Sequence, residues 1–192
     1  MTVGASRYDR KANEAYWTER WATEALLRHL PVDGDTIWEP AAGNCRMADV
    51  LADHGAMVLT SDIAQYDRVL VAYLDFFAEV PAAPPFDQAG MIITNPPYGK
   101  GNRMATKFAE LALKRCRGWV CLLLTAKWDS GKSRLHLTRD NPRFHTKIVL
   151  VDRISWEGNG KTGTEDHCWF VWQPDGDPWR EPSLLYEGKV AG

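Results

Sequence analysis

The segment best equipped for chemistry is Asn95-Pro96-Pro97-Tyr98, which follows the apolar run Met91 to Thr94. Two successive prolines can neither continue a strand ladder nor enter a helix interior, so this segment is a rigid turn. The side-chain oxygen of Asn95 and the carbonyl of Pro96 offer two acceptors for the hydrogens of an amine, and Tyr98 offers a ring for stacking. A purely structural turn with Tyr98 packed against the domain is the alternative.

Acidic residues close three of the other runs that have strand character. Glu39, Asp62 and Asp75 stand at the carboxyl ends of predicted strands, as Asn95 does. In open α/β sheets that edge binds ligands. Each residue taken singly is better explained as a strand-ending turn or a helix cap, but four in register favour a binding edge.

The turn after Glu39 consists of small residues, Pro40-Ala41-Ala42-Gly43, so its backbone can approach a ligand closely. The turn lacks the G-x-G-x-x-G spacing, which favours a ligand without a pyrophosphate over NAD or FAD. Asp62 lies 19 residues after Gly43, where an acidic side chain can accept hydrogen bonds from ribose hydroxyls. The pattern predicts an adenosine-type ligand.

The elements that must position these residues alternate between strand and helix patterns. Apolar runs predict strands over residues 36–39, 57–62, 72–75, 91–95 and 119–124. Helical spacing predicts helices over 18–30, 46–53 and 104–115, with Thr18 as a candidate cap. Two further runs, 147–155 and 167–173, are joined by a glycine-rich loop and predict a hairpin. Parallel strands with crossover helices are therefore expected, followed by this hairpin.

Charge is distributed unevenly along the chain, whose formal net charge is −2. Residues 100–150 hold 12 Lys and Arg against 3 Asp and Glu, which suggests a face that meets a polyanion such as nucleic acid. Turn-forming residues predict a long loop over 127–143. The candidate nucleic-acid contacts are Lys127, Trp128, Lys132, Arg134, Arg139 and Arg143. The alternatives are a solvated helix face for the cations between 107 and 117, and a loop-bracing role for Trp128.

Together these residues resemble the S-adenosylmethionine-dependent N6-adenine methyltransferases, especially the small phage-type DNA members, whose hallmark is Asn95-Pro96-Pro97-Tyr98. The similarity runs from Tyr16-Trp17-Thr18 to Trp169-Phe170-Val171-Trp172. It implies a Rossmann-like class I methyltransferase fold, α/β, with a central, mostly parallel seven-stranded sheet, a C-terminal antiparallel hairpin and helices on both faces. The length of the chain predicts one catalytic domain over residues 1–192, and the chain has no insert large enough for a separate target-recognition domain.

The resemblance also implies roles for single residues. The residues implied to bind S-adenosylmethionine are Thr18, Glu39, Pro40, Ala41, Ala42, Gly43, Asp62, Ile63, Asp75, Phe76 and Asn95. Among them Glu39 and the small turn would hold the methionine part, Asp62 the ribose, and Asp75 with Phe76 the adenine. Asn95, Pro96, Pro97 and Tyr98 would hold a target adenine flipped out of the duplex while the methyl group moves in line. Glu19 stands where the family has proline after the residue matching Thr18.

Other classes of protein lack the residues they need. Both Gly-Lys-[Ser/Thr] tripeptides lack the first glycine of a phosphate-binding loop, and a Pro-Cys pair for cytosine C5 methylation is absent. Cys45, Cys116, Cys121 and Cys168 show no metal-ligand spacing, so we expect reduced, buried thiols and no metal. Neither a signal-peptide pattern nor an apolar run of bilayer length occurs, so we expect a cytoplasmic protein that does not bind a membrane.

The expected activity is therefore N6 methylation of adenine in DNA, with S-adenosylmethionine as cofactor and nucleic acid as partner. Three alternatives stay open. The same chemistry could act on RNA, or on a glutamine amide of a protein, which also needs two acceptors. An inactive cofactor-binding subunit could present nucleic acid to another protein. The sequence is compatible with a monomer or a homodimer.

Overall fold

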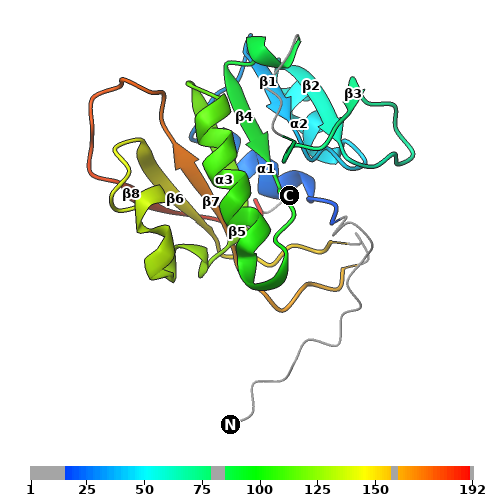
Figure 1. Ribbon diagram of the computed structural model, residues 1–192. Helices are drawn as coiled ribbons and strands as arrows, with labels where there is room; N and C mark the ends of the chain where they lie inside the picture. The colour runs from blue at the N-terminus through cyan, green and yellow to red at the C-terminus, as the bar shows by residue number, and fades with distance from the viewer. Residues whose placement is uncertain (1–15, 79–84, 157–159, 191–192) are drawn as a thin grey trace.

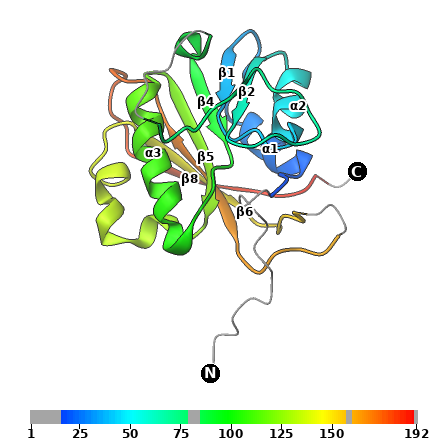
Figure 2. The same cartoon turned by 45° about the vertical axis from the view of Figure 1, so that its right-hand side comes forward.

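One mixed sheet forms the centre of the molecule (Figure 1). The computed structural model of the chain describes residues 16–78, 85–156 and 160–190. Within them the sheet has eight strands in the order β3-β2-β1-β4-β5-β7-β6-β8. Helices cover both faces, with α3 on one side and α1 and α2 on the other (Figure 2). The α/β architecture predicted from the sequence is confirmed.

Five strands form the parallel half of the sheet. They are β1 (Thr36–Glu39), β2 (Met57–Asp62), β3 (Ala72–Tyr73), β4 (Met91–Thr94) and β5 (Trp119–Thr125). Their carboxyl ends therefore share one edge, and β1 and β2 have the bounds that the sequence predicts. The strand β3 ends at Tyr73, which leaves Asp75 in the loop beyond it. Asn95 directly follows β4.

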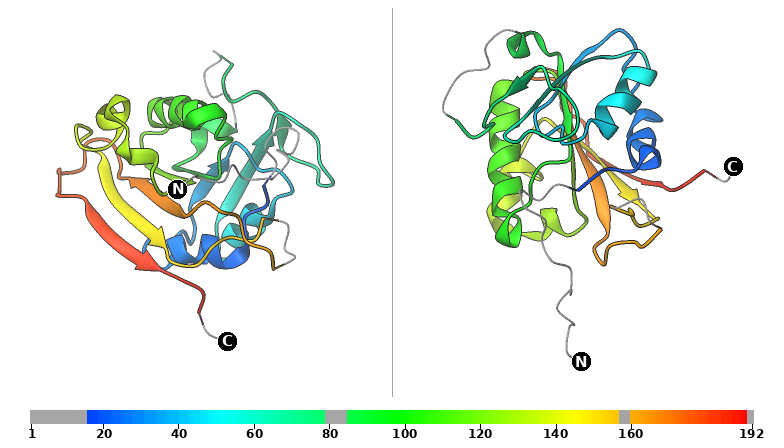
Figure 3. Two further views of the ribbon diagram at one scale, coloured as in Figure 1. Left: turned by 90° about the horizontal axis from the view of Figure 1, so that it is seen from below. Right: turned by 90° about the vertical axis from the view of Figure 1, so that its right-hand side faces the viewer.

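The C-terminal part of the sheet contains one antiparallel strand. β6 (Phe144–Leu150) and β7 (His167–Trp172) pair antiparallel, as the predicted hairpin requires, but β7 lies between β5 and β6. β6 begins and ends earlier than predicted. An eighth strand, β8 (Ser183–Glu187), pairs parallel to β6 and was not predicted. Its apolar residues Leu184 and Tyr186 are 53% and 65% exposed, so they do not form the buried run by which strands are recognised. Figure 3 shows the twisted sheet from below in its left view, and in its right view with α3 and the pair α1 and α2 on opposite sides of the sheet.

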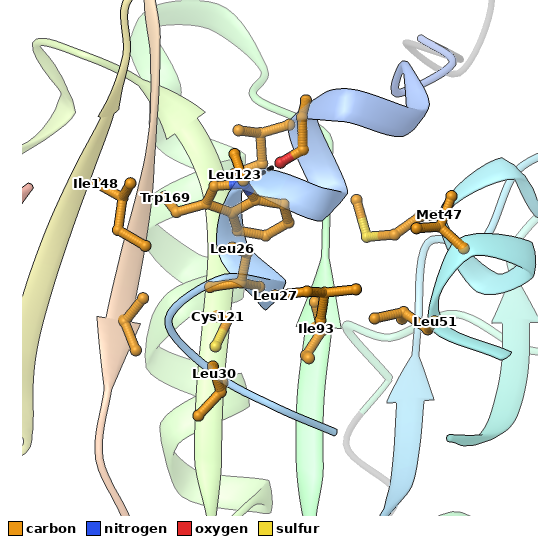
Figure 4. Packing of buried hydrophobic residues seen from close by; sticks show 14 of the residues in the cluster. Leu26, Leu27, Leu30, Met47, Leu51, Ile93, Cys121, Leu123, Ile148 and Trp169 are labelled. Atoms are coloured by element: carbon orange, nitrogen blue, oxygen red, sulfur yellow. Dashed lines mark hydrogen bonds between the residues drawn. The ribbon is translucent and has the colours of Figure 1, made fainter. Parts of the chain in front are cut away.

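Three α-helices fix the sheet from both sides. They are α1 (Arg20–Leu27), α2 (Arg46–Asp53) and α3 (Arg103–Arg115). In α1 the spacing of Ala22, Ala25 and Leu26 puts all three on one buried face. Glu19, not Thr18, precedes the first helical residue, and its side chain forms no capping hydrogen bond. Residues of α1 and α2 pack on Ile93 and Leu123, and the indole nitrogen of Trp169 donates a hydrogen bond to the carbonyl of Ala22 at 2.7 Å (Figure 4).

The opposite face of the sheet carries a second apolar cluster. Phe108, Ala109 and Ala112 of α3 are fully buried against alternate residues of β4 and β5. Four short 3-10 helices complete the described chain: η2 (Phe86–Gln88), η3 (Lys100–Asn102), η4 (Trp128–Ser130) and η5 (Lys132–Leu137). The predicted loop over 127–143 therefore contains η4 and η5. The four cysteines are free and buried, as predicted.

No helix in the described ranges is long and apolar enough to cross a membrane. Nor does this part of the chain contain a cluster of His, Cys, Asp or Glu arranged to hold a metal ion.

Candidate functional site: a cavity at the carboxyl ends of the strands

A cavity of about 540 Å³ opens at the shared carboxyl edge of the parallel strands. This volume is in the range of small-molecule sites. Its lining contains every residue that the sequence proposes for cofactor binding: Thr18, Glu39, Pro40, Ala41, Ala42, Gly43, Asp62, Ile63, Asp75, Phe76 and Asn95. These residues come from the ends of β1, β2 and β4, from the loop after β3, and from the segment before α1. The topology thus gathers residues that are up to 77 positions apart.

Glu39 gives the cavity a buried carboxyl group. The residue is 2% exposed, and its Oε2 atom has no hydrogen-bond partner among the described residues. Burial raises the pKa of Glu39 well above its usual range, and the negative charge of nearby Asp62 raises it further. Because an unpaired buried carboxylate is unstable, this position favours a cationic group in the cavity.

Asp62 fixes the small-residue turn after β1. Its Oδ2 accepts a hydrogen bond from the backbone N–H of Gly43 at 2.9 Å, and its Oδ1 accepts one from Ala64 at 3.0 Å. Gly43 has a φ of 53°, and a Cβ there would lie 2.9 Å from Cζ3 of Trp17. Glycine is therefore needed both for the backbone conformation and for the close approach of the indole ring.

An aromatic wall closes the side of the cavity next to α3. The rings of Phe76 and Phe108 stack with centroids 4.1 Å apart and planes 18° apart. Arg115 holds this segment against α3, because its guanidinium donates to the carbonyls of Phe76 and Ala78. Asp75 is exposed beside the wall, and its Oδ1 accepts from the backbone N–H of Phe77 at 2.8 Å. The result is a flat apolar surface next to a carboxylate.

The tetrapeptide is joined to both the cavity and the core. Asn95 and Pro97 line the cavity, and Nδ2 of Asn95 donates to Oγ1 of Thr18 at 3.3 Å. The hydroxyl of Tyr98 lies 2.9 Å from Oδ1 of Asn95 and 3.2 Å from the carbonyl of Leu123. The ring of Tyr98 therefore packs inward, over the imidazole of His167 at a centroid distance of 5.9 Å. Burial lowers the pKa of His167 to about 4, so this ring is neutral at physiological pH.

Several lining residues were not singled out in the sequence. Trp17 and Tyr66, which also line the cavity, meet edge to face with ring centroids 5.4 Å apart, and Phe108 supplies the second ring of the aromatic wall. Among the described residues of the lining, Arg46 at the start of α2 is the only Lys or Arg, beside the acidic Glu39, Asp62 and Asp75. Its place directly after the small-residue turn was the sequence signal that could have identified it.

The basic segment differs from the sequence expectation at Trp128, Arg134 and Arg143. Trp128 is fully buried, with its ring edge-on to Phe170 at 5.1 Å, so it braces the loop and cannot stack on a nucleotide. The Arg143 guanidinium donates to four backbone carbonyls, those of Leu113, Cys116, Gly118 and Gln173. Arg143 therefore ties the end of α3 to the end of β7 and is not a free surface cation.

Arg134 is likewise engaged within the protein. Its Nε donates to Oγ1 of Thr106 at 3.2 Å, Nη1 to the carbonyl of Trp128 at 2.5 Å and Nη2 to the carbonyl of Gly101 at 3.3 Å. Arg139 is exposed and paired with Asp140 at 2.7 Å. Lys127 and Lys132 are exposed. Of the six candidate nucleic-acid contacts, these two lysines alone are exposed and lack a carboxylate partner among the described residues.

Comparison with known proteins supports the fold. No family model and no curated protein matches the sequence. The "putative class I S-adenosylmethionine-dependent methyltransferase" of Listeria monocytogenes is similar in structure, with a TM-score of 0.60, 11% identity and coverage of 87% of this chain and 62% of that one. For the "putative RNA methyltransferase" of Pyrococcus horikoshii the TM-score is 0.59, with 15% identity and coverage of 80% and 83%.

A third similar structure is the modification subunit of a "putative type I restriction enzyme" from Vibrio vulnificus, with a TM-score of 0.61, 11% identity and coverage of 92% of this chain. The chain spans only 47% of that subunit. These low identities establish the fold alone, and they confirm the expectation for it. The chain has the Rossmann-like fold of the class I methyltransferases.

Proposed function

We propose that the protein transfers a methyl group from S-adenosylmethionine to the N6 amine of adenine in DNA. The observation that carries the proposal is the position of Asn95, at the start of the rigid Asn-Pro-Pro-Tyr turn and in the wall of the cavity that contains Glu39 and Asp62. The candidate amine acceptor and the candidate cofactor site are therefore in direct contact. The methyltransferase fold supports the same assignment.

The cavity fits S-adenosylmethionine by charge. Its lining holds three acidic residues and one arginine, and the cofactor carries two cationic groups, its sulfonium and its ammonium, and one carboxylate. The unpaired Oε2 of Glu39 suits the ammonium group, and Arg46 suits the carboxylate. Asp62 would accept from the ribose, and Phe76 with Asp75 would hold the adenine. When bound, the cofactor supplies a methyl group on a positively charged sulfur.

The residues of the tetrapeptide prepare the nucleophile. The lone pair of an exocyclic aromatic amine is delocalised into its ring, which makes the amine a weak nucleophile. Oδ1 of Asn95 and the carbonyl of Pro96 would accept its two hydrogens and direct the lone pair toward the cavity. Proline suits this position because it has a carbonyl but no N–H to compete. Positioning then provides most of the rate enhancement.

Nucleic acid is favoured over a protein substrate by charge. A glutamine amide would also satisfy two acceptors, but it leaves without a partner of opposite charge those exposed cations of residues 100–150 that form no ion pair within the described chain, such as Lys100, Lys127 and Lys132. Adenine in RNA would be held by the same groups. We infer DNA from the resemblance of the tetrapeptide and its surroundings to DNA adenine methyltransferases.

The test is nucleoside analysis by mass spectrometry. The protein is incubated with S-adenosylmethionine and, in separate tubes, unmethylated duplex DNA, single-stranded DNA and RNA. We expect N6-methyldeoxyadenosine in a DNA tube, and we expect Asn95→Ala to lose this product while binding the cofactor with nearly unchanged affinity. If only the RNA tube contains N6-methyladenosine, the substrate is RNA and not DNA. Equal activity of Asn95→Ala would disprove the mechanism.

A further inference from the structure

Most exposed arginines of the described chain are neutralised. Six of them lie 2.5–2.9 Å from a carboxylate oxygen, namely Arg20, Arg28, Arg68, Arg117, Arg139 and Arg153. Pairs of this kind leave little positive potential for a partner. Four exposed cations next to the tetrapeptide differ, because no described carboxylate lies within ion-pair distance of them. They are Lys100, Arg103, Lys127 and Lys132, called here the cationic edge.

Arg134 gathers the cationic edge from three separate turns. Its guanidinium donates to the carbonyl of Gly101, which follows Lys100, and to the carbonyl of Trp128, which follows Lys127. The Cβ position of Gly131, which precedes Lys132, lies 2.8 Å from Nη1 of the same guanidinium. Lys100, Lys127 and Lys132 are therefore each adjacent in sequence to a residue that contacts the Arg134 side chain. Nδ2 of Asn102 donates to Oγ1 of Thr125 at 3.0 Å and further ties η3 to the end of β5.

The cationic edge borders the candidate catalytic turn. The backbone N–H groups of Met104 and Ala105, directly after Arg103, donate to the carbonyl of Tyr98 at 3.1 and 3.3 Å. Met104 also lines the cavity. Lys100 and Arg103 therefore lie directly beside the turn that contains Asn95, and Arg134 brings the turns of Lys127 and Lys132 to the same side.

We propose that Lys100, Arg103, Lys127 and Lys132 bind the backbone phosphates that flank the target base. The inference rests on the proposed function in taking a nucleic acid as substrate. Arg134 acts as a positioning residue, because it holds the three turns and does not itself face the phosphates. Each phosphate that a cation neutralises releases a counterion, so the contribution of the edge is measured by salt dependence. The cationic edge replaces the six nucleic-acid contacts expected from the sequence, of which it keeps only Lys127 and Lys132.

The experiment measures binding of labelled duplex DNA, single-stranded DNA and duplex RNA by fluorescence anisotropy over a series of salt concentrations. The test variant carries Lys100→Gln, Arg103→Gln, Lys127→Gln and Lys132→Gln. The control variant removes the same charge away from the edge, with Lys114→Gln, Arg117→Gln, Arg139→Gln and Arg153→Gln. Affinity for S-adenosylmethionine, measured by calorimetry, verifies that both variants keep the folded cavity.

We expect the test variant to bind duplex DNA roughly tenfold or more weakly at low salt, with a slope of log K against log salt reduced by about 3 to 4. We expect the control variant to bind nearly as the wild-type protein does. A larger effect with single-stranded DNA or RNA would identify that strand as the one held. Equal losses in both variants, no loss in the test variant, or no binding of any nucleic acid by the wild-type protein would overturn the proposal.

Methylation of adenine is measured separately with the same proteins. If adenine is methylated but the test variant binds as the wild type does, the cationic edge is wrong and the proposed function stands. If the test variant loses binding but no tube contains methylated adenine, the edge stands and the proposed function fails.

Discussion

The hydroxyl of Tyr98 donates a hydrogen bond to Oδ1 of Asn95 at 2.9 Å and so takes one of the two lone pairs of the oxygen that the proposed reaction requires as an acceptor for the target amine. In the ligand-free protein the tyrosine therefore competes with its own substrate. The amine can bind at the second lone pair of this oxygen, and at both once the hydroxyl turns to its other acceptor, the carbonyl of Leu123 at 3.2 Å.

Tyr98→Phe frees that acceptor and retains the ring. One hydrogen bond has a net value of about 0.5–1.5 kcal/mol, so we expect KM for the target base to fall about twofold to tenfold, with kcat maintained. Steady-state kinetics of both variants provides the measurement, and Tyr98→Ala, which removes the ring that packs on His167 beside Asn95, should have a raised KM. A loss of kcat in Tyr98→Phe would show that the hydroxyl itself takes part in the reaction.

Glu39→Gln should make the ligand-free protein more stable at high pH and weaken its cofactor binding. Burial raises the folded-state pKa of Glu39 well above its ordinary 4.5, so the stability from this group is fully present below about pH 4.5 and is lost as pH rises through the folded-state pKa. Each unit of raised pKa corresponds to about 1.4 kcal/mol, or roughly 3–6 °C in Tm. Thermal unfolding over a pH series tests this, and a Tm difference from wild type that does not grow with pH would contradict it.

Arg46→Gln should weaken binding of S-adenosylmethionine. A charge-assisted hydrogen bond contributes about 1.5–3 kcal/mol, so we expect a loss of roughly tenfold to a hundredfold by calorimetry. Arg68→Gln is the matched control, because Arg68 is paired with Asp49, a residue of the same helix α2 as Arg46, and lies outside the cavity lining. Unchanged affinity in Arg46→Gln would remove this residue from the cofactor site.

Gly43→Ala should destabilise the protein and reduce cofactor affinity. The substitution forces alanine into a left-handed conformation, and its Cβ would lie 2.9 Å from Trp17. Gly34→Ala separates the two effects, since Gly34 has a φ of 77° and nothing lies within 4 Å of its Cβ position. We expect Gly43→Ala to lower the free energy of unfolding by more than the roughly 1–2 kcal/mol of the control. Chemical denaturation measures both, and equal losses would mean that Trp17 moves aside without cost.

Arg143→Gln should act on stability and not on nucleic-acid binding. The Arg143 guanidinium donates to four backbone carbonyls that join α3 to β7, and burial lowers its pKa. Loss of these bonds should reduce the free energy of unfolding by more than about 2 kcal/mol. The salt dependence of DNA binding should remain that of the wild type, and a reduced slope would restore Arg143 to the nucleic-acid surface.

Local sequence patterns were sufficient to predict the parallel half of the sheet and the residues of the candidate cavity. The runs at 36–39 and 57–62 are bounded by turn residues, and Glu39 and Asp62 end them, so their shared edge followed from strand direction alone. The partners of long side chains did not follow in this way. Arg134, Arg143 and Trp128 look like surface residues in the sequence, but contacts with carbonyls and rings from distant segments make them structural. Arg46 was missed for the converse reason, because its only signal in the sequence is its place shortly after the small-residue turn, and a single cation there is easily read as an ordinary helix-start residue.

The insertion of β7 between β5 and β6 also determines when the ring of Tyr98 gains its packing partner during synthesis. β5 pairs with β4 and with residues 167–172, and His167 supplies the ring on which Tyr98 rests. Because synthesis starts at the N-terminus, the Asn-Pro-Pro-Tyr turn is made long before β7 exists. β5 must therefore wait with one edge unpaired across more than forty residues of later sequence. Closing this long-range pairing is an entropically slow step, so completion of the sheet and packing of Tyr98 on His167 are expected to be one late folding event.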